Sequence, residues 1–301
     1  MRTRLGINTC FAVKRWPRPA DWIPVVRDEL GLDLVQHSFD LVRAGTTGAE
    51  VADLRAKVAA AGIELHSTFT GLAAYSANLL LDPDPAGRAE AEAWYAWAID
   101  LTAAMGGRAT GGHVGAFSVA DWVDPALRAA AWVRLGAALK RLAARASAAG
   151  LEYLMVENRA AAREPSTMTM IRDLLTDGDP DHVPIALCLD VGHMCAPGTN
   201  GPDRDPLAWV AELGARAPVL QLQQSDAEGD HHWPFTAERN EAGRIDADTL
   251  LEALEASGAD EPVLILEMIP PFEQDDDALL DDLRASVAYW RDALEHRGLA
   301  V

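Results

Sequence analysis

Eight short apolar runs recur along the chain, and they alternate with segments whose apolar residues have helical spacing. The runs cover residues 4–10, 33–39, 63–69, 108–114, 151–158, 184–190, 218–224 and 262–268. Helical patterns are clearest at 86–105, 124–149, 246–257 and 276–296. Strict alternation of strand and helix predicts parallel strands that are joined by helical crossovers.

Eight such units without a ninth predict an α/β fold of the closed (β/α)₈ type, the TIM barrel. The length of 301 residues suits one barrel, and 49% apolar residues can supply a large core. No linker or change of composition divides the chain, so we expect a single domain over residues 1–301. An open doubly wound sheet is the alternative, but no G-x-G-x-x-G motif follows the first run.

Composition restricts the partners and the compartment. A net charge of −20 disfavours a nucleic-acid partner. The three cysteines, Cys10, Cys188 and Cys195, form no C-x-x-C pair, which is typical of free thiols in a reducing compartment. We find no signal-type apolar segment and no uncharged stretch near the ~20 residues of a membrane span. We therefore expect a cytoplasmic protein with no membrane partner, and the sequence leaves a homo-oligomer open.

Four polar residues end the last four apolar runs, where further apolar residues would otherwise be expected. They are Glu157, Asp190, Gln223 and Glu267, separated by 33, 33 and 44 residues. These separations are close to the ~31 residues of one βα unit, so the four side chains should lie at one level of the barrel. Isolated strand-end acids could each face solvent, but converging buried carboxylates repel one another and need a counter-charge. The pattern predicts a divalent metal site.

The same pattern resembles a known family. Glu157, the motif L-D-x-x-H at 189–193, a polar residue on the seventh run and a final L-E at 266–267 are similar to the xylose-isomerase-like sugar isomerases and epimerases. That group includes tagatose 3-epimerase-type enzymes and hydroxypyruvate isomerase. The resemblance implies Mn²⁺ or Mg²⁺ on the four residues, with Glu157 and Glu267 as the proton-transferring pair. Many epimerases of the group have His where this chain has Gln223, and an all-oxygen shell suits Mn²⁺, Mg²⁺ or Co²⁺ better than Zn²⁺.

Three histidines are candidates for substrate binding. His193 lies three residues after Asp190, and the resemblance implies that it contacts a substrate oxygen. Its alternative role is to orient Asp190. His66 and His113 lie in the third and fourth runs. We expect both to face the barrel mouth and to bind sugar hydroxyls, although a lone histidine is more often part of the core.

Two long insertions, 71–85 and 224–245, follow strands, where the active-site loops of a barrel lie. In the second insertion, His231 and His232 could bind a second metal, as in three-metal nucleases of related fold. We favour a covering loop that includes Trp233 and Phe235, with Trp233 against the substrate. Asp226 is expected to hold the substrate or a neighbouring ligand.

Cations near the barrel mouth stand out in so acidic a chain. Lys14 follows the first run, and Arg159 and Arg163 follow the fifth. Arginine binds carboxylates and phosphates through two parallel hydrogen bonds, so these residues could hold an anionic part of the substrate. Ordinary surface ion pairing is the alternative.

The favoured function is a divalent-metal-dependent isomerase or epimerase of a small ketose or aldose, or of its acid or phosphate derivative. Proton transfer would pass through a metal-bound enediolate. The alternative is a lyase on the same scaffold, either a decarboxylase of a 3-oxo sugar acid or a β-eliminating enzyme, with Arg159, Arg163 and Lys14 on the carboxylate. A phosphodiesterase like endonuclease IV would need more histidine ligands and a basic surface. A non-catalytic scaffold would not explain four buried polar strand ends.

Overall fold

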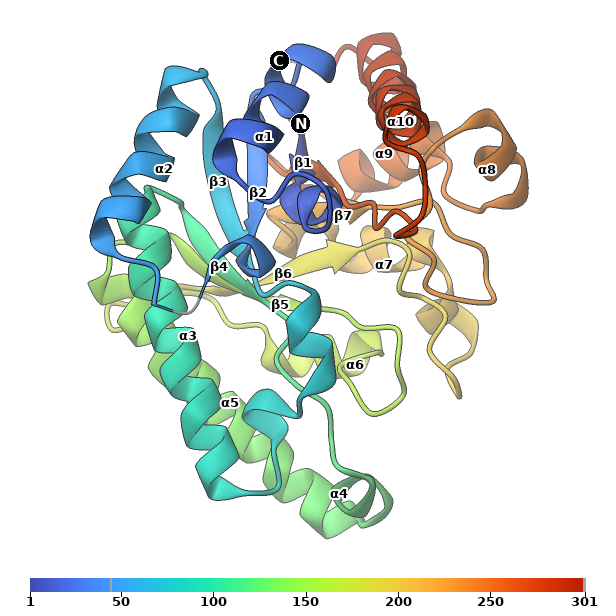
Figure 1. The fold of residues 1–301 in the computed structure, drawn as a ribbon. Helices are drawn as coiled ribbons and strands as arrows, with labels where there is room; N and C mark the ends of the chain where they lie inside the picture. Colours follow the sequence, from blue (N-terminus) through green and yellow to red (C-terminus); the bar gives the residue numbers. More distant parts are fainter. Residues whose placement is uncertain (44, 300–301) are drawn as a thin grey trace.

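Eight parallel strands close into one barrel in the order β1 to β8, as predicted, with helices around it (Figure 1). The computed structural model describes residues 1–43 and 45–299. Because the sheet closes, the open doubly wound alternative is wrong. The strands are β1 Arg4–Asn8, β2 Leu34–Ser38, β3 Glu64–Phe69, β4 Ala109–Gly112, β5 Tyr153–Glu157, β6 Ile185–Asp190, β7 Val219–Leu222 and β8 Val263–Leu266.

The helices that follow the strands form the outer ring (Figure 1). They are α1 Pro19–Pro24, α2 Gly48–Ala60, α3 Pro85–Met105, α5 Pro125–Ala148, α6 Met168–Leu174, α7 Pro206–Leu213, α9 Ala247–Ala256 and α10 Asp276–His296. Short helices α4 Val119–Val123 and α8 Ala237–Ala242 lie in connections, and a π-helix over Val25–Glu29 continues α1. Single 3₁₀ turns occur at Thr9–Ala12, Phe39–Leu41, Leu72–Ser76, Leu79–Leu81, Gly201–Arg204 and Gly214–Arg216. Within the described residues, no helix has the length and apolarity that a membrane crossing requires.

Asp-Pro pairs set where three of the ring helices begin. The side chains of Asp84, Asp124 and Asp205 accept hydrogen bonds from backbone N–H groups in the first turns of α3, α5 and α7. A proline follows each aspartate at the first helical position, where its missing N–H breaks no helical bond. These pairs fix the point at which each loop leaves the barrel rim and its helix starts.

Inward-facing side chains recur every second residue along the strands and fill the barrel. A buried cluster inside the barrel contains Leu34, Phe69, Ala109, Tyr153, Met155, Cys188, Val219, Val263 and Ile265. Glu157, Asp190, Gln223 and Glu267 each lie two residues beyond an inward-facing residue of β5, β6, β7 or β8. The four predicted site residues therefore occupy the next inward position, at the carboxyl ends of their strands.

Strand β4 needs glycine to pass close to β5. Gly111 has a φ of 144°, a conformation that L-residues rarely adopt. A Cβ atom on Gly111 would lie 2.0 Å from the carbonyl oxygen of Met155. The backbone of β4 thus packs against β5, which carries Glu157, without room for a side chain.

We expect Gly111→Ala to lower the free energy of unfolding by about 2–5 kcal/mol, because it combines a steric clash with an unfavourable φ. Urea unfolding followed by circular dichroism measures this change. Gly136→Ala is the matched control, since a Cβ there meets nothing within 4 Å and the residue lies in helix α5. Equal stability of the two variants would show that β4 can move away from β5.

Candidate active site

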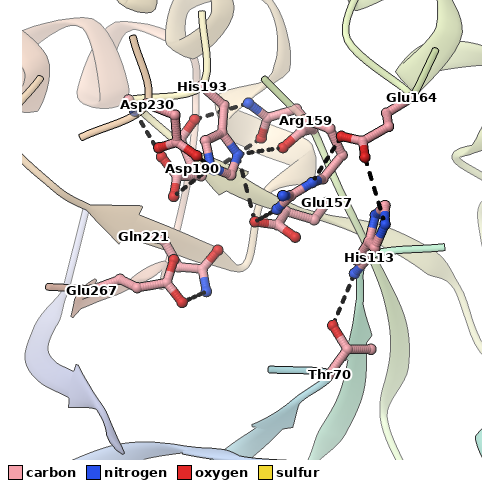
Figure 2. Close-up of polar contacts among 12 residues, drawn as sticks. Thr70, His113, Glu157, Arg159, Glu164, Asp190, His193, Gln221, Asp230 and Glu267 are labelled. Carbon is pink, nitrogen blue, oxygen red and sulfur yellow. Dashed lines mark hydrogen bonds and ion pairs between the residues drawn. The ribbon is translucent and has the colours of Figure 1, made fainter. Parts of the chain in front are cut away.

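Three buried carboxylates converge at the barrel mouth. Glu157 ends β5, Asp190 ends β6 and Glu267 follows β8, and each offers an oxygen within 4.8 Å of the other two (Figure 2). We call these three residues the carboxylate cluster. Oε2 of Glu157 and Oε2 of Glu267 are buried and accept no hydrogen bond from the described residues, while Oε1 of Glu157 is held by an ion pair with Arg159. Like charges at this separation repel, so the cluster requires positive charge nearby.

Amide side chains inside the barrel hold one oxygen of Glu267 by hydrogen bonds. Its Oε1 accepts hydrogen bonds from Asn8 Nδ2 and Gln221 Nε2, each at 3.0 Å. Both amides also donate to Gln36 Oε1, at 2.8 and 2.9 Å. One oxygen of Glu267 is therefore fixed, and the other is left for the cluster.

Glu157 is paired with a buried arginine. Arg159 Nη1 lies 2.8 Å from Glu157 Oε1, and Arg159 Nε lies 3.5 Å from Glu164 Oε2. The guanidinium is also 3.9 Å from the ring centroid of Tyr75, in the insertion after β3. Burial raises the pKa of Glu157, while Arg159 and His193 oppose this shift. Arg159 is close to the cluster, as predicted, but its guanidinium already pairs with the carboxylates of Glu157 and Glu164.

His193 lies between the cluster and the loop after β7. Its Nδ1 is 2.7 Å from the carbonyl oxygen of Asn158, which can only accept, so this nitrogen carries the proton. Its Nε2 is 3.5 Å from Asp190 and 3.2 Å from Asp230 (Figure 2). Burial alone would lower the pKa of His193, but the two aspartates raise it to about 10. This position suits both the substrate-contacting and the Asp190-orienting role.

Gln223 adjoins the cluster, but its amide is oriented differently from the prediction. The backbone N–H of His232 donates to Gln223 Oε1 at 2.6 Å, and Gln223 Nε2 donates to both oxygens of Asp190 at 3.1 Å. This hydrogen bond uses one of the two lone pairs of Gln223 Oε1. In this arrangement Gln223 is a hydrogen-bond donor to Asp190, and its role as an oxygen ligand stays a prediction.

His232 enters the site through an unusual backbone conformation. It has a φ of 49° and is buried, with Nδ1 3.2 Å from the carbonyl oxygen of Glu267. Its ring, with Asp190 and His193, forms a second group of potential ligands within 4.8 Å. Asp230 lies between the two imidazoles, 3.1 Å from His232 Nε2, so ion pairs explain why these rings lie close together.

His113 faces the same region, whereas His66 does not. His113 is fully buried after β4, and its backbone N–H donates to Thr70 Oγ1. Both nitrogens of its imidazole ring lack a hydrogen-bond partner among the described residues. His66 lies near the start of β3, with Nε2 3.5 Å from the hydroxyl of Tyr153 at the start of β5. The prediction for His66 is wrong because it lies at the opposite end of the barrel.

The structure does not bring four other predicted residues into contact with the cluster. Asp226 accepts from His231 Nε2 at 2.9 Å. The ring of Trp233 stacks on the ring of His231, with 4.0 Å between the ring centroids. The covering-loop interpretation therefore fits His231 and Trp233. Lys14 is exposed and lies 5.0 Å from the ring of Phe272, and Arg163 donates to the carbonyl oxygen of Phe117. These contacts engage the side chains elsewhere, so the structure gives no support to a substrate contact by Asp226, Trp233, Lys14 or Arg163.

Sequence reasoning missed three residues that contact the site. They are Asp230, Glu164 and Tyr75, all in loops after strands. The spacing Asp230-x-His232 in a polar loop after the seventh run was the available signal for Asp230. Glu164 and Tyr75 have no comparable signal, because their contacts with Arg159 depend on how two loops fold back over the barrel.

The donor set fits a divalent cation. Three converging carboxylates, of which Glu157 and Glu267 each keep a buried oxygen without a hydrogen-bond partner among the described residues, match the oxygen ligands that Mg²⁺ and Mn²⁺ prefer. Without such an ion, burial raises the pKa of Glu267 well above its usual range, and Asp190 and Glu157 add to that effect, while His232 opposes it. A bound cation would remove this penalty.

Comparisons with known proteins agree with the fold. Residues 27–293 match the xylose isomerase-like TIM barrel family. The chain is 27% identical to D-erythrulose 1-phosphate 3-epimerase of Brucella abortus over 300 residues, 96% of each chain.

Solved structures extend the comparison. A protein from Rhodospirillum rubrum, provisionally named a xylose isomerase, shares 32% identity with a TM-score of 0.87, over 96% of this chain and 99% of that one. D-psicose 3-epimerase from Clostridium cellulolyticum has the same fold, with a TM-score of 0.71 at 18% identity, over 97% of this chain and 99% of that one. The chain belongs to the xylose isomerase-like TIM barrel family.

Proposed function

We propose that this protein is a divalent-metal-dependent epimerase or isomerase of a small ketose or its phosphate derivative. One observation carries the proposal. Glu157 on β5 and Glu267 after β8 border the same space, and Oε2 of each is buried without a hydrogen-bond partner among the described residues. Their strands are three apart in a barrel of eight, so the two carboxylates approach that space from well-separated directions. Such a pair suits removal of a proton by one group and its return by the other.

The cluster would hold the ion through Glu157, Asp190 and Glu267, with Gln223 hydrogen-bonded to Asp190. When bound, Mn²⁺, or Mg²⁺ or Co²⁺ in its place, would act as a Lewis acid that lowers the cost of negative charge on a substrate oxygen. One glutamate takes the proton from the carbon next to the carbonyl group. Return of a proton to the opposite face gives epimerisation, and return to the neighbouring carbon gives isomerisation. His193 and His113 bind substrate oxygens from the sides.

The relatives support an epimerase or isomerase rather than a lyase. The curated relative is an epimerase that covers nearly the whole chain. The lyase alternative relied on Arg159, Arg163 and Lys14 to hold a carboxylate. Arg159 is paired with Glu157 and Glu164, and Arg163 donates to a backbone carbonyl. Lys14 lies on the exposed ring of Phe272, so the contacts of these three residues give the lyase no specific support.

We expect one Mn²⁺ ion per chain, and Asp190→Asn to weaken its binding far more than Gln223→Ala, because Asp190 contributes a charge and Gln223 a neutral amide. Isothermal titration calorimetry with Mn²⁺ measures both. Asp226→Asn is the control, since Asp226 contacts His231 rather than the cluster. Zinc bound stoichiometrically at His231 and His232, with the cluster empty, would contradict the proposal.

Glu157→Gln and Glu267→Gln should each lower turnover by about 10²–10⁴-fold, the usual contribution of a general acid or base. Steady-state kinetics with a ketose panel measures the loss. Glu152→Gln is the matched control, because Glu152 is exposed at the amino end of β5 and pairs with Arg108. Near-normal turnover by either cluster variant would exclude that glutamate from proton transfer.

Incubation of a good ketose substrate with the Mn²⁺-loaded enzyme in D₂O should place deuterium on a carbon next to the carbonyl, with the carbon count unchanged. The product of epimerisation and the product of isomerisation each retain every carbon of the substrate, whereas decarboxylation releases CO₂. Mass spectrometry of the products and a CO₂ assay distinguish these outcomes. Consumption of a 3-oxo sugar acid with loss of CO₂, without exchange into any ketose, would establish the lyase instead.

A further inference from the structure

Within the part of the chain that the structure describes, the carboxylate cluster offers no free guanidinium or ammonium group to an anionic substrate. Among the described residues that contact the cluster, Arg159 is the one arginine or lysine, and both Glu157 and Glu164 lie against it. Its guanidinium is also covered by the ring of Tyr75. If the substrate carries a phosphate or a carboxylate, as the substrate of the curated epimerase relative does, that group needs cations elsewhere at the mouth.

Two arginines from the loops after β6 and β7 lie together beside the site. Arg244 Nη1 donates to the carbonyl oxygen of Arg204 at 2.8 Å, and Arg204 Nη2 donates to the carbonyl oxygen of Ala227. Arg244 Nη2 donates to the carbonyl oxygen of Met194 at 3.0 Å, next to His193. The backbone N–H of Arg244 donates to Ser225, two residues after Gln223. The pair therefore joins the two loops that carry His193 and Asp230.

The charges of this pair are not neutralised by direct contact. Within the described residues, the hydrogen bonds of both side chains go to peptide carbonyls, and Arg244 Nε is buried without a partner. Neither side chain is fully exposed, so solvent compensates for only part of the charge. Burial lowers the pKa of Arg244 and the charge of Arg204 adds to this effect, while Cys195, Asp226 and Asp205 oppose it. Two like charges held close together in a chain of net charge −20 would be stabilised by an anion.

The thiol of Cys195 interacts electrostatically both with this pair of arginines and with Asp190 and Asp230. Cys195 is buried, and its backbone N–H donates to the carbonyl oxygen of His193 at 2.8 Å. Burial raises the pKa of this thiol, and Asp230 and Asp190 add to this effect, while Arg244 and Arg204 oppose it. The guanidinium of Arg244, bonded to the carbonyl oxygen of Met194, therefore lies one residue along the chain from His193.

We propose that Arg204 and Arg244 bind an anionic group, a phosphate ester or a carboxylate, at the end of the substrate remote from the reacting carbon. This proposal rests on the proposed function and specifies its substrate class. The arginines contact no reacting atom, so they determine specificity and are not catalytic. A neutral ketose would be a poor substrate because it leaves the paired charges without a counter-ion.

Steady-state kinetics on three matched ketoses tests the proposal with the Mn²⁺-loaded enzyme. The substrates are D-erythrulose 1-phosphate, D-erythrulose and a hexuluronate, which carries a carboxylate. We expect one anionic substrate to exceed the neutral ketose in kcat/KM by about tenfold to a hundredfold, as charge-assisted hydrogen bonds usually give. Preference for the phosphate ester or for the hexuluronate identifies the source of the anion. Equal kcat/KM for all three overturns the proposal.

Variants assign the preference to the arginines. Arg204→Gln and Arg244→Gln should each reduce the anionic-to-neutral ratio of kcat/KM by about tenfold, mainly through KM. A structural disturbance of the loops would instead lower activity on both substrates and leave the ratio unchanged, which overturns the proposal. Arg244→Lys should restore part of the ratio because it retains the charge. Arg134→Gln is the control, because Arg134 is exposed on α5.

Equilibrium binding separates this proposal from the proposed function. Calorimetric titration of the Mg²⁺-loaded protein with inorganic phosphate should show binding that Arg204→Gln and Arg244→Gln weaken about tenfold. If the protein epimerises no ketose but binds phosphate in this way, the anion subsite stands and the proposed function fails. A dissociation constant for phosphate that neither substitution changes means that the anion binds the metal, and the subsite is then excluded.

Discussion

Convergence of three buried carboxylates is the constraint on which the rest of the barrel mouth depends. Glu157, Asp190 and Glu267 are brought within 4.8 Å because parallel strands in a closed barrel end on one rim. Burial of even one unpaired carboxylate costs several kcal/mol. The neighbouring residues compensate for this cost with positive charge and with N–H donors, and a metal ion would complete that compensation.

The compensating groups come from all around the barrel, which explains why the site requires the complete fold. Asn8 and Gln221 hold one oxygen of Glu267 from inside the barrel, and Gln223 donates to Asp190 from the rim. Arg159 neutralises Glu157 and is itself covered by Tyr75 from another loop. Apart from the Arg159–Glu157 pair, each of these contacts joins segments at least 33 residues apart in sequence, so local stability alone cannot build the site.

The sequence was informative where periodicity controls position. The polar strand ends could be predicted because side chains alternate along a strand and the βα units have similar length. The position of His66 could not, because β3 continues to Phe69, three residues beyond it, which leaves His66 near the start of the strand. The amide orientation of Gln223 depends on a backbone N–H nine residues later, and Asp230 depends on how a loop closes. Long-range hydrogen bonds of this kind leave no periodic signal.

The loop after β7 has consequences for how this protein could change during evolution. Gln224 and Trp233 exchange two backbone hydrogen bonds, at 2.9 and 3.0 Å, and so close the segment between them into a ring of fixed length. An insertion or deletion inside that ring would replace His232 at the Gln223 amide with a neighbour. Length variation among descendants of this chain should therefore avoid residues 225–232 and accumulate instead in the insertion at 71–85. New substrate preferences would then arise there by changes in loop length, while the ring could change only by substitution.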